Sequence, residues 1–465
     1  MKKRNHPDCK NIIADKPVED AFARIKSKAE QVKSTITEGK YKIVSACYGR
    51  IEHILFVYPK LSADTCEPIH EDLVAELIVA LRKKNPNLRI TIVANDERKI
   101  NKLNTNLKNN KGSAVIKDSI IISNLFDAWD NVRELKQTLE WALIGDAQKK
   151  RVFRYFNRLV NPNVLTTSLP LTFWVQDPFL VLNSLTPKNN DKILLLEPDY
   201  FLPTGRLIAN HLKNKMGAHF IHFEKFGFRF EGGNILAGKD FALVGANTVD
   251  RIKKKIGGNN WKNAVSEYLV GIPENEIYEI RSSPYNSTIT GKMNGLAFMG
   301  SSVLEGEQPM FHIDMFIALA GKNENGEEVI MIGDPVSVYN EHDDILKAVA
   351  GKISEVKTSL TSQGFDVRPV PMPFTYMHVA KEQEPKWYFA TYNNCLVQIV
   401  NEKDKTVWIP QFAFDDWKDE LEEYEKTIRC KWNLLGFEVN FIHEFHLCAQ
   451  YRGALHCMVK CLKRT

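Results

Sequence analysis

Short apolar runs alternate with stretches of helical period along most of this sequence. Near the N-terminus, residues 42–46 and 54–58 form two apolar, strand-like runs. Residues 71–83 have helical spacing, and residues 88–94 form a further strand. Residues 1–40 are mostly polar and charged, and we expect them to form an N-terminal helical leader.

One pattern recurs four times in the rest of the chain. A polar or acidic residue opens an apolar strand, a short polar turn follows, and a second apolar strand ends in a turn residue. The copies begin at Trp174, Phe230, Phe311 and Tyr392, and their second strands lie at 192–196, 241–245, 328–333 and 406–410. Helical stretches follow at about 206–216, 247–270, 343–363 and 415–434.

A repeated strand–strand–helix unit predicts radial or stacked repetition. The copies begin 56, 81 and 81 residues apart, which is too irregular for a simple solenoid. We therefore expect an α/β fold built as a pseudo-symmetric propeller with insertions. A helical period without strand signal predicts one insertion at about residues 127–160, within a single domain over residues 41–465.

Composition narrows the functional classes. Of the 465 residues, 44% are hydrophobic, which is enough for a large core. The net charge of +5 comes from 62 basic and 57 acidic residues that are scattered along the chain, so no nucleic-acid partner is expected. No apolar run approaches the roughly 20 residues that span a bilayer, and the N-terminus lacks a signal segment. These features predict a cytoplasmic protein with no membrane partner, although export by a non-cleaved route would leave no mark.

The eight cysteines predict free thiols rather than a metal site. They lie at positions 9, 47, 66, 395, 430, 448, 457 and 461, with no C-x-x-C pair and no zinc-finger spacing. Sparse cysteines in a long chain are typical of a reducing compartment. No EF-hand calcium loop is present either. We expect no metal and no cofactor.

Candidate functional residues gather at the openings of the repeated copies. Repeats arranged around an axis bring equivalent positions together at one end of that axis. The residues are Asp177, Glu231, Asn234, His312, Asp314 and the pair Asn393–Asn394. We expect them to converge on one pocket.

Each of these motifs also has a plainer interpretation. His312 and Asp314 are expected on one face of a strand, where imidazole and carboxylate could shuttle protons, but a histidine in an apolar strand is more often a core residue. Glu231 precedes two glycines, which indicates close approach of a ligand or of another backbone, or else a β-bulge or tight turn with an exposed Glu. Asp177 precedes a proline, where an aspartate commonly caps a turn.

Cys457 is the candidate nucleophile. Most cysteines in a chain like this one are small buried hydrophobes. Cys457 differs because His456 precedes it and Arg452 lies five residues back, and both favour a thiolate. Cys395 is the competitor, but it is expected inside an apolar strand with no basic neighbour.

One thiol, one histidine and three carboxylates restrict the chemistry. A single histidine without a second His or Cys at ligand spacing is poor for zinc. A cysteine protease needs only one group to orient its histidine, which leaves two acids without a role. A planar cation, in contrast, needs carboxylates to accept its paired N–H groups. The set therefore favours nucleophilic attack on a guanidinium carbon.

These motifs resemble the guanidino-group-modifying superfamily of arginine, agmatine and peptidylarginine deiminases and amidinotransferases. Residues 169–179 resemble the arginine-deiminase block that ends in Arg-Asp-Pro-Phe, although Gln176 stands at the arginine. Phe230–Asn234 resembles Glu-Gly-Gly-Asp, and His312–Asp314 resembles His-Leu-Asp. Residues 441–457 are similar to the C-terminal block of peptidylarginine deiminases. The resemblance implies the pentein fold, a five-bladed pseudo-symmetric α/β propeller.

The resemblance also implies a role for each position. Asp177 and Asp314 would grip the guanidinium, with Asn234 and Asn394 at the substrate. Glu231 would orient His312, and Cys457 would form a covalent thiouronium intermediate that hydrolyses to a ureido product and ammonia.

The substrate and the outcome stay open at this point. Arg452 matches an arginine that contacts the substrate carboxylate or backbone carbonyl, which favours arginine, free or in a protein, as the guanidinium partner. The alternatives are an amidinotransferase, in which an amine replaces water, and a non-catalytic binding protein of the same fold.

Overall fold

The structure is a computed structural model of the full chain. It describes residues 34–35, 40–58, 67–94, 97–111, 116–121, 175–186, 192–198, 203–216, 219–226, 230–256, 260–266, 268–281, 310, 312–338, 343–377, 386–413, 418–443, 445, 448 and 453–465. The expected leader, apart from residues 34–35 and 40, and the expected insertion at about 127–160 lie outside these residues. Both stay predictions.

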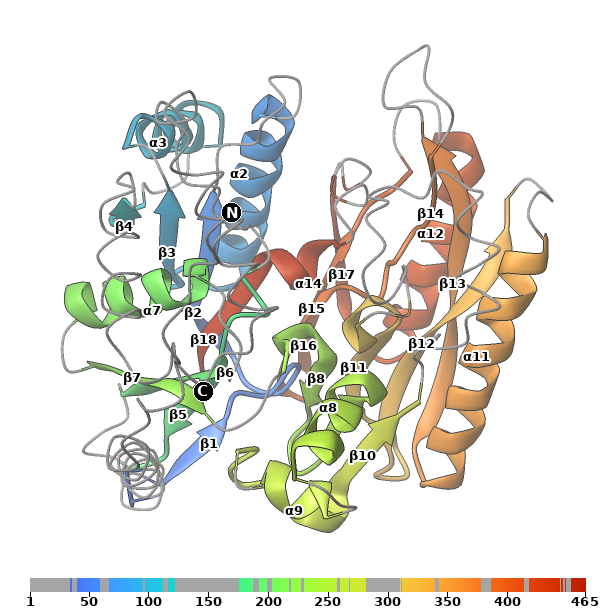
Figure 1. The fold of residues 1–465 in the computed structure, drawn as a ribbon. Helices are drawn as coiled ribbons and strands as arrows, with labels where there is room; N and C mark the ends of the chain where they lie inside the picture. The colour runs from blue at the N-terminus through green and yellow to red at the C-terminus, as the bar shows by residue number, and fades with distance from the viewer. Residues whose placement is uncertain are drawn as a thin grey trace, which may run out of the picture.

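The described strands form five separate sheets of three or four strands (Figure 1). One contains β1 (Tyr41–Ile43), β5 (Leu180–Ser184), β6 (Ile193–Pro198) and β7 (Phe220–Phe226). The second contains β8 (Ile235–Ala237), β9 (Ala242–Gly245) and β10 (Ile277–Ile280). The third contains β11 (Ile317–Lys322), β12 (Glu328–Ser337), β13 (Asp366–Met377) and β14 (Lys386–Phe389). The fourth contains β15 (Leu396–Asn401), β16 (Asp404–Pro410) and β17 (Glu438–Ile442). The fifth contains β18 (Val459–Arg464), β2 (Ile51–Tyr58), β3 (Arg89–Ala94) and β4 (Asp118–Ile121).

Every sheet contains the same three-strand unit. Two strands pair antiparallel, and a helical crossover then leads to a third strand that pairs parallel with the second. The units are β5–β6–β7, β8–β9–β10, β11–β12–β13, β15–β16–β17 and β18–β2–β3. The crossovers contain α7 (Pro203–Met216), α8 (Ala246–Ile256) with α9 (Trp261–Ser266), α11 (Asp343–Ser362), α12 (Lys418–Asn433) and α2 (Glu67–Lys84).

The predicted α/β repeat is confirmed, with one unit more than the sequence pattern contains. The fifth unit is split between the ends of the chain, because β18 pairs with β2 and places Val459 opposite Phe56. No described sheet closes on itself.

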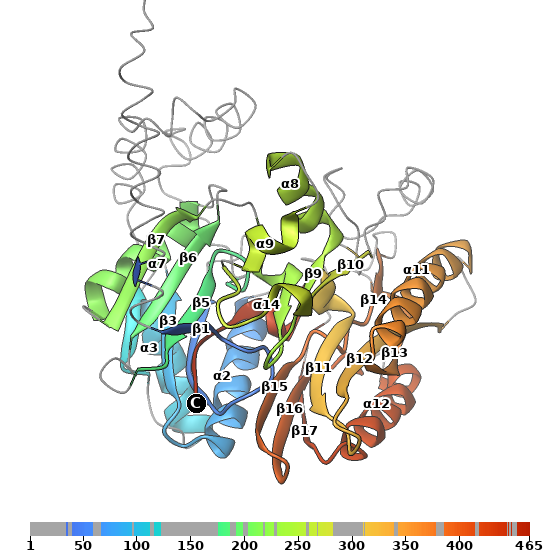
Figure 2. The ribbon, with the colours of Figure 1, turned by 90° about the horizontal axis from the view of Figure 1, so that it is seen from below.

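Burial explains why the strands read as continuous apolar runs. In β2 every residue but Glu52 is buried, since its sheet is covered on both faces. The crossover helices α7, α11 and α12 lie at the periphery, whereas the one-turn helix α14 (Leu455–Met458) lies between the sheets (Figure 2). None of the described helices is long and apolar enough to cross a membrane.

Candidate active site

All five sheets carry candidate residues in the turn that precedes the first strand of the repeated unit. Asp177 precedes β5, Glu231 precedes β8, and His312 with Asp314 precedes β11. Asn394 precedes β15, and Cys457 precedes β18. Equivalent positions of the five units therefore supply the polar groups of one site.

The local conformation differs from the expected strands. Ile313–Met315 is a short 3-10 helix, η5, and His312 is its N-cap residue with φ −128° and ψ 144°. Glu231 caps a second 3-10 helix, η3 (Gly232–Asn234), in the same way. Cys457 lies in α14 and not in a strand. The expectation that His312 and Asp314 share a strand face was wrong, because a tight turn presents them instead.

His312 lies among carboxylates. Its Nε2 atom is 2.9 Å from Oε2 of Glu231, and its Nδ1 atom is 3.8 Å from Oδ1 of Asp177. The histidine side chain is only 6% exposed. Burial lowers the pKa of His312, but Asp177, Glu231 and Asp314 outweigh burial and raise it from 6.5 to about 9. The imidazole is therefore positively charged at neutral pH.

The positive charge on His312 can be tested by an NMR titration. The imidazole of His312 should titrate near pH 9, and Glu231→Gln should move its pKa down towards 6.5. The exposed Glu423→Gln variant is the matched control. Because the pKa is raised in the folded state, the stability that the charge contributes is complete below pH 6.5 and is lost as the pH rises to about 9. An unchanged His312 pKa in Glu231→Gln would contradict the assignment.

Two glycines let the turns approach each other. A Cβ atom on Gly233 would lie 2.9 Å from both Nδ1 of His312 and Oδ2 of Asp314. A Cβ atom on Gly232 would lie 2.0 Å from the backbone oxygen of Gln176. The close approach that the glycine pair indicated is thus present, and His312 and Asp314 border the same small space.

Cys457 is buried beside Asp314. Its Sγ atom is 3.5 Å from Oδ2 of Asp314 and accepts a hydrogen bond of 3.1 Å from Nδ2 of Asn394. Burial raises the pKa of the thiol well above 9, and Asp314 and Asp177 raise it further, whereas the Asn394 hydrogen bond lowers it. Among the described residues, the carboxylates therefore favour the neutral thiol, and the expected contribution of Arg452 to a thiolate stays a prediction.

Cys395, the alternative nucleophile, lies in different surroundings from Cys457. It lies in the turn before β15 with 4% exposure, and burial alone raises the pKa of its thiol. No carboxylate or imidazole among the described residues perturbs that pKa.

The two asparagines connect the turns to one another. Asn234 accepts a hydrogen bond from the backbone N–H of Ile313 at 3.3 Å and donates to Thr248 at 2.9 Å and to Asn247. Asn394 accepts from the backbone N–H of Cys457 at 3.2 Å. Asn394 also donates to the backbone oxygen of Asp314 at 3.1 Å. These contacts hold η3, η5 and α14 in register.

The two oxygens of Asp314 have different surroundings. The carboxylate is 1% exposed, and Oδ2 is 2.8 Å from Nδ1 of His456. Oδ1 is buried and has no hydrogen-bond partner among the described residues. A buried carboxylate oxygen without a donor indicates that a ligand completes the site.

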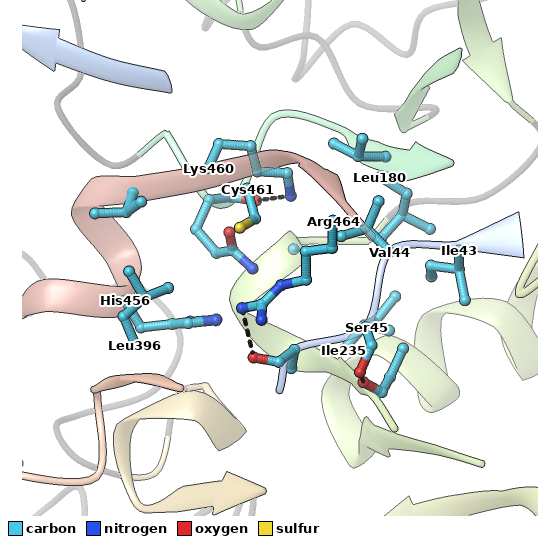
Figure 3. A pocket seen from close by; sticks show the side chains of 16 residues that line it. Ile43, Val44, Ser45, Leu180, Ile235, Leu396, His456, Lys460, Cys461 and Arg464 are labelled. Atoms are coloured by element: carbon cyan, nitrogen blue, oxygen red, sulfur yellow. Dashed lines mark hydrogen bonds between the residues drawn. The ribbon is translucent and has the colours of Figure 1, made fainter. Parts of the chain in front are cut away.

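Sequence patterns missed several neighbours of the site. Arg251 of α8 has Nη1 at 3.4 Å from Oε1 of Glu231, and nothing in the sequence connects these positions. Lys460 donates to the backbone oxygen of Gln176 at 2.8 Å (Figure 3). Burial lowers the pKa of Lys460 to about 8, although Asp177, Cys461 and Asp314 oppose that shift. Arg452 lies outside the described residues.

A cavity of about 50 Å³ adjoins the site, and Figure 3 shows its walls. Its lining includes Gln176, Gly232, His456, Lys460 and Arg464. Arg464 donates to the backbone oxygens of Ala46, Cys47 and Gly49. Among the described residues, no group of three or more His, Cys, Asp or Glu side chains is arranged to hold a metal ion.

Comparisons with known proteins give matches in structure but not in sequence. No protein-family model and no curated protein matches the chain. The solved structure of C. jejuni agmatine deiminase matches with a TM-score of 0.52 and 13% identity, over 90% of this chain and 95% of that one. A cysteine-to-serine variant of that enzyme with substrate bound matches with a TM-score of 0.52 and 13% identity, over 91% and 97%. The chain therefore shares the α/β fold of these guanidino-modifying enzymes.

Proposed function

We propose that this chain is a cysteine-dependent hydrolase that deiminates a guanidinium group. The observation that supports this most is the convergence of one thiol, a histidine–glutamate pair and two further carboxylates from four of five equivalent turns. In this proposal the five sheets are the blades of a five-bladed propeller, and residues 41–465 form one catalytic domain.

The guanidinium is proposed to bind between Asp177 and Asp314. Burial raises the pKa of Asp177, and its neighbours Glu231 and Asp314 raise it further, although His312 and the Gly233 N–H oppose this. Asp177, Glu231 and Asp314 lie close together and repel one another, and a planar cation relieves that repulsion. Oδ1 of Asp314, which has no donor in the part of the chain that the structure describes, is a ready acceptor for a guanidinium N–H.

Binding of the cation also activates the nucleophile. The carboxylates that hold the thiol neutral are the groups that the guanidinium neutralises. We infer that Cys457 releases its proton to solvent when the substrate binds. His312 is already protonated at neutral pH, which is the form needed to donate a proton to a leaving amine.

The proposed reaction then proceeds in two steps, formation and hydrolysis of the covalent intermediate. Attack of the Cys457 thiolate on the guanidinium carbon forms a C–S bond, and a C–N bond breaks as His312 gives its proton to the departing ammonia. His312, now neutral, removes a proton from water, and the hydroxide adds to the thiouronium carbon. The C–S bond breaks to give the ureido product, the thiolate is restored, and ammonia takes up the remaining proton.

Two features point to different substrates. Arg452 matches an arginine that contacts the substrate carboxylate or backbone carbonyl, and it supports arginine, free or in a protein, with citrulline as the product. The similar solved structures are of agmatine deiminase, and agmatine has no carboxylate. Arginine is the proposed substrate, and agmatine is the alternative.

One experiment tests the reaction and the substrate together. The protein is incubated with arginine, agmatine or an arginine-rich protein. The release of ammonia is measured, together with the mass of the product, in which an oxygen atom replaces an imino group of the substrate. Turnover should need no acceptor. Product formation that requires added glycine or lysine would indicate an amidinotransferase, and no product from any guanidino compound would overturn the proposal.

A further inference from the structure

His456 is a buried imidazole that the proposed reaction does not use. Its Nδ1 atom is 2.8 Å from Oδ2 of Asp314, and the two side chains are 10% and 2% exposed. Its backbone N–H donates to the oxygen of Asn394 at 3.0 Å, which fixes the start of α14 against the turn before β15. The residue is therefore fixed through its backbone as well as through its ring.

The chemistry of the pair determines where the proton lies. An ionised carboxylate only accepts hydrogen bonds, so Nδ1 of His456 must carry the hydrogen. Oδ2 of Asp314 is further occupied by the Cys457 thiol at 3.5 Å. Oδ1 is the oxygen that has no donor among the described residues.

We propose that His456 is a positioning residue that locks the Asp314 carboxylate so that Oδ1 alone accepts from the guanidinium. This inference rests on the proposed function, because it assigns Asp314 to substrate binding. Without the Nδ1 donor, the carboxylate is free to rotate about its terminal torsion, which has a broad and two-fold energy profile. The plane of the carboxylate would then vary, and the direction in which an oxygen accepts from the substrate would no longer be fixed.

Two substitutions of His456 distinguish the effect of losing the Nδ1 hydrogen-bond donor from the effect of losing the volume of the ring. The amide nitrogen of Asn replaces Nδ1, whereas the amide nitrogen of Gln replaces Nε2. We expect His456→Gln to raise KM for the guanidino substrate about tenfold to a hundredfold, as for loss of a hydrogen bond to a charged group. His456→Asn should stay within about threefold of wild type. The exposed His443→Gln is the control for loss of an imidazole.

Alkylation by iodoacetamide distinguishes positioning from damage to α14. This reagent is neutral and needs no carboxylate, so the rate at Cys457 should be equal in the Gln variant and in wild type. If the wild-type protein turns over its substrate and His456→Gln has an unchanged KM, the positioning role is overturned while the proposed function stands. If Asn and Gln variants lose activity equally and Cys457 alkylation slows in both, the role is structural and the inference fails.

The wild-type protein supplies a measurement that does not depend on turnover. In ¹⁵N-histidine NMR spectra, Nδ1 of His456 should be protonated throughout the pH range in which the protein is folded. The signal is assigned by its disappearance in His456→Asn. A neutral ring with the hydrogen on Nε2 would overturn the inference. A wild-type protein without activity on any guanidino compound would overturn both proposals.

Discussion

Replacing Cys457 with serine is expected to reduce ammonia release by a factor of about 10⁴ or more, with the fold intact. The serine hydroxyl can still accept the Asn394 hydrogen bond that the sulfur accepts at 3.1 Å, so α14 should stay in place. The hydroxyl cannot replace the thiolate as nucleophile, because substrate binding is not enough to ionise it. Initial rates of ammonia release and a thermal unfolding scan measure the two parts of this prediction.

Cys395→Ala is the control for the alternative nucleophile. Cys395 lies next to Asn394 in sequence, but its thiol is enclosed in apolar surroundings. The alanine variant should therefore retain wild-type turnover per folded molecule. If Cys395→Ala is inactive and Cys457→Ser is active, the nucleophile has been assigned to the wrong cysteine.

The residues of the site could be predicted from sequence because the repeat places them at equivalent positions. Asp177, Glu231, His312 and Asp314 each open a copy, and the structure brings their copies together. The strands and crossover helices were predictable for a related reason, since fully buried strands are apolar along their whole length. The helical pattern at residues 343–363, for example, is α11 (Asp343–Ser362).

Other features of the fold and of the site could not be predicted from the sequence, because they depend on contacts between residues that are far apart in the chain. The fifth unit joins Val459 to Phe56, and a pairing so distant in sequence leaves no local pattern. The apolar residues of η5 predict a strand because residues such as Ile313 are buried in either conformation. The bond between His456 and Asp314 also depends on the packing of two turns. Its only sequence signal was the position of His456 beside the candidate nucleophile.

The charges around Cys457 affect its thiol in the opposite direction to the one that the sequence predicts. Basic residues near Cys457 suggested a thiolate at rest, but the bond from His456 goes to Asp314 and not to the sulfur. The carboxylates then dominate, so the free protein holds a neutral thiol and a charged His312. Such a thiol reacts slowly with neutral electrophiles and faster once a cation has entered the site.

This arrangement predicts a strong preference between two alkylating agents of nearly equal shape. Chloroacetamidine carries a planar cation, whereas chloroacetamide is its neutral counterpart. After correction for their reactivity with free cysteine, the cation should alkylate Cys457 about a hundredfold faster or more, because Asp177 and Asp314 bind it and its charge lowers the pKa of the thiol. Peptide mapping of the labelled protein identifies the alkylated cysteine.

Asp177→Asn should reduce that preference to about tenfold or less, because the variant loses one of the two carboxylates that neutralise the cation. The exposed Asp419→Asn variant on α12 carries the same change in net charge and should keep the full preference. Together the two variants separate a local effect of the site from attraction by the charge of the whole protein. Equal corrected rates for both reagents in the wild-type protein would mean that the turns do not form a cation site. The thiol at position 457 would then be an ordinary buried cysteine, and a non-catalytic protein with this fold would be the better interpretation.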